Sequence, residues 1–388
     1  MSKEENRKNF SKYVSQNILG MIGFSCYVLA DSYFISIAKG ADGLTALNLV
    51  MPLYSIIFSI GEMIGVGSAI RYAISKIKKD ADADDYFWNA LIWCILSSIL
   101  FVFAGIFFSA DIMRVLGADE HIVAVGNNYT KIFMCFAPMF MCNYVTNAFV
   151  RNDGAPGIAM SATLFSSLFN IVFDYILMFP MKLGMEGAAL ATALSPIIGM
   201  GICSIHFFSK KSSVRLVVCK PSVRKLVAGS QLGVSAFVGE MSSAVITLAF
   251  NFVILKLTGN VGVAAYGVVA NIAIVTTAVF NGVAQGSQPL ISSCFGRGDK
   301  DGCTQLKRMG YTTAFVLAAV MYSILFIFAE QFVAVFNSEG SEMLRLYATE
   351  GVKLYFIGIF FAGINIVGGG AFSATEDAFK AAVVSVAR

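Results

Sequence analysis

The segment FWNALIWCILSSILFVFAGIFFSA, residues 87–110, contains no charged side chain. About 20 apolar residues in a helix cross the hydrocarbon core of a bilayer, so this run is long enough to span a membrane. Comparable runs occur at residues 14–38, 43–70, 123–149, 156–180, 186–208, 227–257, 261–290, 311–336 and 347–372, and an eleventh begins near Phe379. Because unpaired backbone groups are very costly in lipid, the pattern predicts an all-α polytopic membrane protein.

The composition excludes several other classes of protein. The 388 residues are 57% apolar and 13% charged, whereas about 25% of a soluble domain is charged. The net charge of only +4 argues against a nucleic-acid partner, and eight cysteines without a CxxC pair argue against a disulfide scaffold. His121 and His206 are the only histidines, so we expect neither a histidine metal site nor an enzyme.

Lysine and arginine are distributed unequally between the two ends of the expected spans. Twenty lie at the N-terminus and in the links after spans two, four, six, eight and ten, and seven lie at the opposite ends. Positively charged loops stay in the cytoplasm. The distribution therefore predicts a multi-pass protein of the cell membrane with a cytoplasmic N-terminus.

A hydrophilic stretch and an internal repeat divide the chain. Gly65-Val66 recurs as Gly282-Val283, 217 positions later, and Gly40 recurs as Gly259. Because six spans is an even number, the two units enter the membrane from the same side as parallel repeats. We expect residues 1–13 as the cytoplasmic N-terminus, 14–208 as a six-helix lobe, 209–226 as a cytoplasmic linker and 227–388 as a partial second lobe.

The second lobe is expected to be incomplete. It has four spans and the start of a fifth, whereas the first lobe has six. The repeat partner of Asp174 would fall beyond the last residue. We therefore interpret the sequence as a C-terminally truncated form, and we expect this form not to transport.

Four acidic residues lie within expected spans, where an ionisable group costs a few kcal/mol and needs a reason to be present. They are Asp31, Glu62, Asp174 and Glu240. Asn170 precedes Asp174 by four residues, so the two share one helix face. Carboxylates with nearby amide and hydroxyl oxygens suit Na⁺, and two carboxylates close together suit a shared proton. Alternatively, Asp31 and Asp174 satisfy helix ends or pair with a buried amide.

Polar amides form a second group of candidates. Asn48, Asn271, Gln285 and Gln288 lie in the second and eighth expected spans, which the repeat makes equivalent. Such side chains either line a cavity or join helices by hydrogen bonds. We retain Glu62, Glu240, Asn271 and Gln288 as candidates for coupling or substrate binding.

Several motifs resemble those of the multidrug and toxic compound extrusion (MATE) transporters. They are Arg151-Asn-Asp-Gly154, Asn170-x-x-x-Asp174-Tyr175, Gly184-x-x-Gly187-Ala-Ala-x-Ala-Thr192, Gly262-Val-Ala-Ala-Tyr-Gly267 and Ala284-Gln-Gly-x-Gln-Pro289. The resemblance covers essentially the whole chain. It implies a prokaryotic-type fold of twelve spans in two six-helix lobes around a central cleft.

The resemblance also implies functional residues. Asp31, Asn170, Asp174 and Thr192 match the positions that bind Na⁺ or H⁺ in the first lobe of prokaryotic members. Glu240 matches a seventh-span glutamate implicated in coupling or in binding cationic substrates. A tenth-span aspartate of some members is missing here, because no carboxylate lies between Lys353 and Thr375.

The expected function is therefore a secondary active antiporter. It would export amphipathic or cationic drugs and metabolites in exchange for Na⁺ or H⁺, as a monomer in the lipid bilayer, with no cofactor besides the coupling ion. One alternative is a flippase for lipid-linked oligosaccharides, which would need several buried bases. Another is a receptor that transports nothing.

Overall fold

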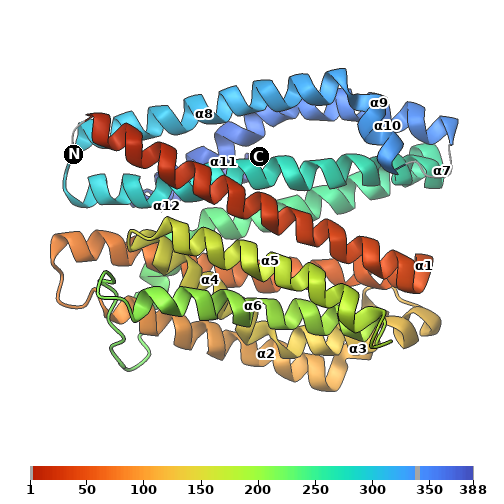
Figure 1. The fold of residues 1–388 in the computed structure, drawn as a ribbon, viewed down its shortest axis with the longest axis horizontal. Coiled ribbons are helices and arrows are strands. Elements are labelled where there is room, and N and C mark those ends of the chain that lie inside the picture. Colours follow the sequence, from red (N-terminus) through yellow and green to blue (C-terminus); the bar gives the residue numbers. More distant parts are fainter. Residues whose placement is uncertain (1–2, 337–340, 388) are drawn as a thin grey trace.

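The structure, a computed structural model, describes residues 3–336 and 341–387, and within them the chain is almost entirely helical. Figure 1 labels the helices. Their bounds are α1 Lys3–Lys78, α2 Asp85–Val115, α3 Glu120–Cys135, α4 Ala137–Asn152, α5 Pro156–Met178, α6 Met185–Phe207, α7 Val223–Gly296, α8 Lys300–Ile327, α9 Ala329–Phe336, α10 Glu342–Tyr355, the 3₁₀ turn η1 Phe356–Gly358, α11 Ile359–Ser373 and α12 Ala378–Val386.

The two longest helices, α1 and α7, each contain two spans joined at a glycine. Gly40 has φ 60° and ψ −143°, and Gly259 has φ 66° and ψ −158°. Side chains with a Cβ rarely adopt such positive φ values, whereas glycine does so freely. The two glycines hold equivalent places in the sequence repeat, so both halves of the chain turn back into the membrane in the same way.

The described residues contain nine helices long and apolar enough to cross a membrane, or up to ten if the bent pair α3–α4 counts as one span. This agrees with the ten expected spans. The expected continuous span at 123–149 is wrong in one respect, because α3 and α4 meet at an angle of 46°. Pro138 lies in the first turn of α4, where its missing N–H interrupts the hydrogen bonding of a continuous helix.

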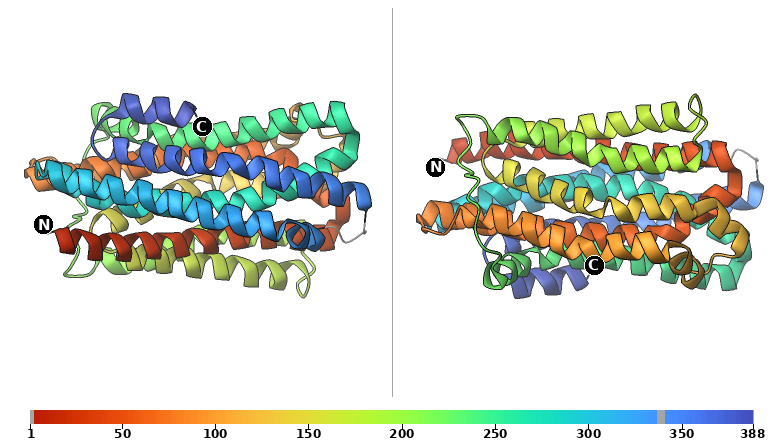
Figure 2. Two further views of the ribbon diagram at one scale, coloured as in Figure 1. Left: turned by 90° about the horizontal axis from the view of Figure 1, so that it is seen from above. Right: turned by 90° about the horizontal axis from the view of Figure 1, so that it is seen from below.

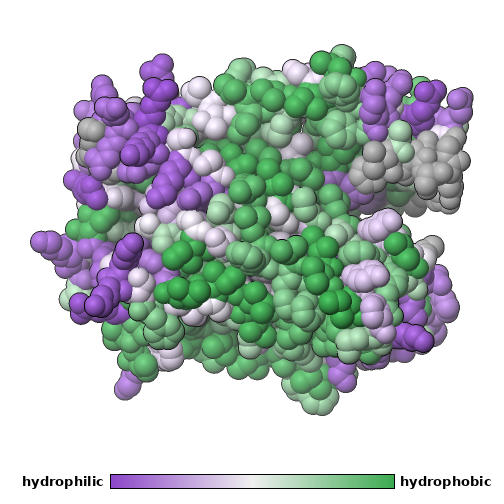
Figure 3. Space-filling model, in the orientation of Figure 1, coloured by the Kyte–Doolittle hydropathy of each residue, from purple (hydrophilic) through white to green (hydrophobic). Residues whose placement is uncertain are grey.

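The helices form two bundles, with the first half of α1 crossing between them (Figures 1 and 2). The first bundle contains α1–α6, and the second contains α7–α12. Apolar side chains form a broad belt around the middle of the visible face, and hydrophilic ones gather toward the two ends (Figure 3). A membrane-spanning orientation accounts for this distribution.

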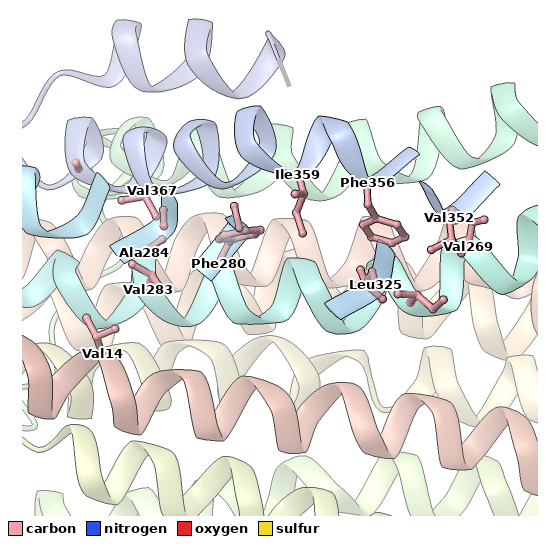
Figure 4. Packing of buried hydrophobic residues seen from close by; sticks show 14 of the residues in the cluster. Val14, Val269, Phe280, Val283, Ala284, Leu325, Val352, Phe356, Ile359 and Val367 are labelled. Atoms are coloured by element: carbon pink, nitrogen blue, oxygen red, sulfur yellow. The ribbon is translucent and has the colours of Figure 1, made fainter. Parts of the chain in front are cut away.

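The N-terminal residues belong to the first helix, because α1 already begins at Lys3. Phe10 and Val14 are buried in the core of the second bundle. Figure 4 shows Val14 pointing from α1 toward Val283 of α7. The first span therefore packs against both bundles.

Hydrogen bonds join the segment between α6 and α7, residues 208–222, to the first bundle at both ends. Asp153 accepts hydrogen bonds from His206 Nε2 at 2.8 Å, Ser212 Oγ at 3.1 Å and the Ser213 backbone N–H at 2.9 Å. At the other end, Asn89 Oδ1 accepts from the backbone N–H of Ser222 at 2.6 Å. We call this segment the linker and the end of the molecule that carries it the linker end.

Glycines bring the two bundles into backbone contact in the half of the molecule near the linker. A Cβ added at Gly233 of α7 would lie 2.0 Å from the Met63 carbonyl oxygen of α1. A Cβ added at Gly286 would lie 2.7 Å from Val14 Cα. Small residues four apart let membrane helices approach this closely, and Gly229 and Gly282 complete the two pairs. The bundles are therefore closed against each other in this half.

Candidate ion-binding and lobe-interface sites

Asp31 and Asp174 are buried between α1 and α5. Their residues are 6% and 0% exposed, respectively. The ring of Phe34, one turn beyond Asp31, lies 6.3 Å from that of Tyr175, so the two helices face each other at this level. The two carboxylates are close enough to interact electrostatically. The structure therefore brings together the two acids on which the expected ion site depends.

Asn170 and Thr192 complete this cluster. An ionised carboxylate can only accept hydrogen bonds, so the Asn170 amide nitrogen faces Asp174 Oδ2, 3.1 Å away. Its oxygen then accepts from the Thr192 hydroxyl at 3.1 Å and the Thr192 backbone N–H at 3.3 Å. Asn170 and Asp174 are on α5 and Thr192 is on α6, so three helices hold the four predicted residues together.

Two oxygens of the cluster have no hydrogen-bond partner among the residues that the structure describes. They are Asp31 Oδ1 and Asp174 Oδ1, and both are buried. A buried acceptor without a partner costs about 1–3 kcal/mol, and more when it is charged. A proton or a Na⁺ ion would satisfy these oxygens and relieve the repulsion between the carboxylates. The residues present therefore fit a small cation or a proton.

Three tyrosines surround the acids and were not predicted from the sequence. Tyr27, Tyr54 and Tyr129 all lie near Asp31 and Asp174. The hydroxyls of Tyr54 and Tyr129 are hydrogen-bonded to each other. Tyr27 precedes Asp31 by four residues, so helical spacing in the sequence was a usable signal for it. Tyr54 and Tyr129 come from other spans and carry no such local signal.

A cavity of about 60 Å³ lies between the two bundles. Glu62 lines it from α1, and Glu240 and Gln288 line it from α7. A water molecule needs roughly 10–15 Å³ of such space, so the cavity has room for a few waters. Of the candidates for coupling or substrate binding, the structure thus brings together Glu62, Glu240 and Gln288. Asn271 lies elsewhere on α7, and neither it nor the exposed Asn48 lines this cavity.

A hydrogen-bonded chain of polar side chains crosses from one bundle to the other beside the cavity. Arg151 of α4 donates to Gln285 Oε1 of α7, and Gln285 Nε2 donates to Glu62 Oε1 of α1 at 3.3 Å. A second Arg151 bond reaches Asn17 Oδ1 at 3.3 Å. Since Arg151 only donates, the Gln285 oxygen faces it and the Gln285 amide nitrogen faces Glu62.

Arg151 corrects one expectation. The sequence suggested that Arg151 lies in the cytoplasmic link after the fourth span, yet it is inside α4 and only 4% exposed. Charge patterns treat an arginine after an apolar run as a loop residue, whereas here the helix continues to Asn152. A buried guanidinium needs partners, and Glu62, with which it interacts electrostatically, supplies the charge.

Two bundles of membrane-spanning helices with buried carboxylates inside and between them define a multi-pass transporter fold. The MatE family model matches residues 17–176 and 236–388. The chain therefore belongs to the MatE family, as its motifs predicted.

Solved structures with the same fold agree. One is the outward-facing conformation of a multidrug resistance MATE family transporter of the MOP superfamily, with a TM-score of 0.91, 20% identity, and coverage of 98% of this chain and 85% of that one. A MOP superfamily transporter from Pyrococcus furiosus gives a TM-score of 0.90 at 20% identity and the same coverage. The expected all-α fold is thereby confirmed.

Curated relatives extend the similarity. The multidrug export protein MepA of Staphylococcus saprophyticus is 24% identical over 372 residues, which cover 95% of this chain and 82% of MepA. MepA of Staphylococcus aureus is 27% identical over 336 residues, which cover 86% of this chain and 72% of that protein.

Proposed function

We propose that the chain is a secondary active antiporter that exports amphipathic or cationic drugs and metabolites in exchange for Na⁺ or H⁺. Membership of the MatE family and the similarity to proteins named multidrug export protein support the substrate class. The observation that carries the coupling step is the pair Asp31 and Asp174, each with a buried carboxylate oxygen that lacks a partner.

Ion exchange would act through the geometry of this pair. With both carboxylates ionised, α1 and α5 hold like charges together in a medium of low dielectric constant, which is unfavourable. An ion or proton arriving from outside the cell removes the repulsion and favours the arrangement that binds it. Antiport then requires only that ion and substrate prefer opposite arrangements by a few kcal/mol.

Orientation follows from charge. Because 20 of the 28 cationic residues belong to one side, we place the linker end and the N-terminus in the cytoplasm of a cell whose plasma membrane holds the protein. The glycine contacts then close the bundles on the cytoplasmic side. We further propose that the protein acts as a monomer and binds no nucleic acid.

Cationic substrates suit the interface between the bundles better than polyanionic lipid head groups. Among the described residues that line the cavity there are two carboxylates and no lysine or arginine. A flippase for lipid-linked oligosaccharides would need the opposite charge. The lining therefore supports a cation exporter over that alternative.

The test is drug efflux from vesicles reconstituted with the full-length protein, under separately imposed Na⁺ and pH gradients. The gradient that drives efflux in the unmodified chain identifies the coupling ion. The double variant Asp31→Asn/Asp174→Asn should lose gradient-driven efflux, because neither carboxamide binds a proton or replaces a charged ligand. Asp111→Asn, at a carboxylate with 63% exposure, should retain it. Ion-driven efflux by the double variant would refute the assignment.

A further inference from the structure

A carboxylate of the second bundle pairs with two bases of the first bundle at the linker end. Glu376 lies in the turn between α11 and α12. One of its oxygens accepts a hydrogen bond from Arg71 Nη1 of α1, and the other lies 3.8 Å from Lys78 Nζ of the same helix. Arg71 and Glu376 are 305 positions apart in the sequence, so only the packing of the two bundles brings them together.

The turn that carries Glu376 is attached to the second bundle. Lys307 Nζ of α8 donates a hydrogen bond to Thr375 Oγ1 at 3.3 Å. The hydroxyls of Ser373 on α11 and Ser235 on α7 are hydrogen-bonded to each other at 2.8 Å. The turn therefore moves with the second bundle, and a separation of the bundles carries its carboxylate away from both bases.

The backbone of Glu376 is in an unusual conformation. Its φ is 60°, in the left-handed region that residues with a Cβ rarely adopt. Such a conformation persists only where the surrounding contacts hold it, and it is found more often at functional positions. The ion pairs with Arg71 and Lys78 are contacts of this kind, because they join the side chain of Glu376 to the neighbouring bundle.

The pair of Arg71 and Glu376 is partly shielded from water. Their side chains are 25% and 23% exposed, respectively. Partly buried charges are screened less by salt than charges on an open surface, where ion pairs contribute little. The Nε of Arg71 is buried and has no hydrogen-bond partner within the described part of the chain, so this guanidinium depends on Glu376.

We propose that Glu376, Arg71 and Lys78 form an ionic latch that holds the two bundles together at the linker end. Separation of the bundles breaks both ion pairs at once, and it exposes one acid on the second bundle and two bases on the first to water. The latch thereby sets how often the linker end opens.

The latch rests on the movement of the two bundles in the proposed function, but it needs no assumption about the substrate or the coupling ion. Its test can therefore be carried out without either of them. A failure of the efflux experiment would leave the result for the latch interpretable, and the reverse also holds.

The measurement is the distance between the bundles in lipid nanodiscs, by electron paramagnetic resonance. Nitroxide labels are attached through Asp80→Cys in the first bundle and Asp301→Cys in the second, in a variant without native cysteines; both positions are exposed. Glu376→Gln nearly keeps the shape of the side chain but removes its charge. It should lower the ratio of closed to open molecules about tenfold, as expected for the loss of a hydrogen bond between charged groups.

An exchange of charges distinguishes a direct contact from a folding defect. Arg71→Glu and Glu376→Arg should each increase the open population, because each brings like charges together. Combined in one chain, the two substitutions restore an ion pair of opposite polarity and should return most molecules to the short distance. A chain that was merely misfolded by one substitution would not regain that distance through the other.

Asp377→Asn is the matched control. Asp377 is the next residue in the same turn, but it pairs at 2.6 Å with Lys380 of its own bundle. Asparagine also preserves the cap at the start of α12. The distance distribution should therefore stay unchanged. Equal opening in Asp377→Asn and Glu376→Gln, a distribution in Glu376→Arg identical to that of the unmodified interface, or a charge exchange that restores nothing would overturn the proposal.

Discussion

Gly286 of α7 lies directly on the backbone of Val14 of α1. A Cβ at position 286 would stand 2.7 Å from Val14 Cα and 2.9 Å from the Tyr13 carbonyl oxygen, closer than side-chain carbons approach backbone atoms in proteins. Neither contact atom belongs to a flexible side chain that could move away. Closure of the bundles near the linker end therefore depends on this position being glycine.

The substitution Gly286→Ala should force α1 and α7 apart. Overpacking of a tight contact costs about 1–3 kcal/mol, so the closed population should fall by roughly tenfold. Nitroxide labels attached through Asp80→Cys and Asp301→Cys, two exposed positions near the linker end, would report this as a longer distance between the bundles. The thermal unfolding temperature in detergent should fall as well.

Gly267→Ala is the matched control for that variant. It is the same substitution in the same helix, but nothing lies within 4 Å of an added Cβ. Alanine also favours the helix by about 0.5–1 kcal/mol over glycine. Equal effects of Gly267→Ala and Gly286→Ala would show that the Val14 contact does not control closure.

Thr192→Val should weaken ion binding at the cluster of Asp31 and Asp174. Valine has nearly the shape of threonine but lacks the hydroxyl that donates to the Asn170 amide oxygen, so Asn170 is no longer held against Asp174. We expect about a tenfold loss of affinity for the coupling ion, equivalent to roughly one hydrogen bond. Isothermal titration or ion-dependent protection from unfolding measures it.

Thr130→Val provides the comparison. Thr130 is also fully buried in the first bundle, but its hydroxyl donates only to the Gly126 carbonyl of its own helix. The affinity for the coupling ion should be unchanged in Thr130→Val. Should both threonine variants lose affinity equally, the effect comes from general packing and Thr192 has no part in the site.

Asp153→Asn should release the linker from the first bundle. The carboxylate accepts from His206, Ser212 and Ser213, and an amide would turn one N–H group toward these donors. Leaving buried donors without an acceptor costs about 1–3 kcal/mol, and the Asp153 and His206 side chains are 3% and 4% exposed. Faster proteolysis between residues 209 and 222 would reveal the release.

Asp42→Asn is a suitable comparison for this variant, because Asp42 forms an aspartate–histidine pair with His121 at 2.9 Å. That pair is exposed, at 52% and 68%, so its loss should change little. Linker cleavage at the same rate in both variants would contradict the anchoring role of Asp153.

Cys219 in the linker should react slowly with iodoacetamide near neutral pH. Partial burial raises the pKa of its thiol and the Asp85 carboxylate raises it further, against an opposing effect of Lys225. Because the thiolate is the nucleophile, the rate should rise as the pH passes above the ordinary thiol range near about 8.5. Mass spectrometry of the linker peptide measures the rate.

Asp85→Asn removes the negative charge that raises this pKa and should therefore accelerate alkylation at a fixed pH. Asp82→Asn serves for comparison, because Asp82 is a neighbouring exposed aspartate that does not act on the thiol. An unchanged rate in Asp85→Asn, or equal acceleration in both variants, would exclude this electrostatic effect.

The sequence predicted most of the architecture because membrane spans leave a local pattern. Long runs without charge predicted the helices, and the repeated glycines Gly40 and Gly259 mark the turn inside each long helix. Hydropathy missed the bend before Pro138, since both sides of it are apolar. The family motifs also placed Asp31 and Asp174 in one cluster, where the structure has them.

Contacts between spans that are distant in the sequence could not be predicted from it. Glu62 and Gln285 are separated by 223 residues, and no periodicity links them. The burial of Arg151 could not be predicted from the sequence either, because its hydrogen-bond partners come from α1 and α7. Such groups became visible only when the packing of the two bundles was known.

The hydrogen bonds that hold the linker on the first bundle determine how a movement of the second bundle is transmitted through the molecule. Since residues 208–222 travel with the first bundle, a swing of the second has its pivot at the first turn of α7, near Lys225 and its partner Asp85. The section Val223–Ile254 of α7 has 32 residues, so it is about 48 Å long. A tilt of about 10° at the pivot would displace its far tip by roughly 8 Å, so a sub-ångström adjustment beside the linker is magnified at the opposite face of the membrane.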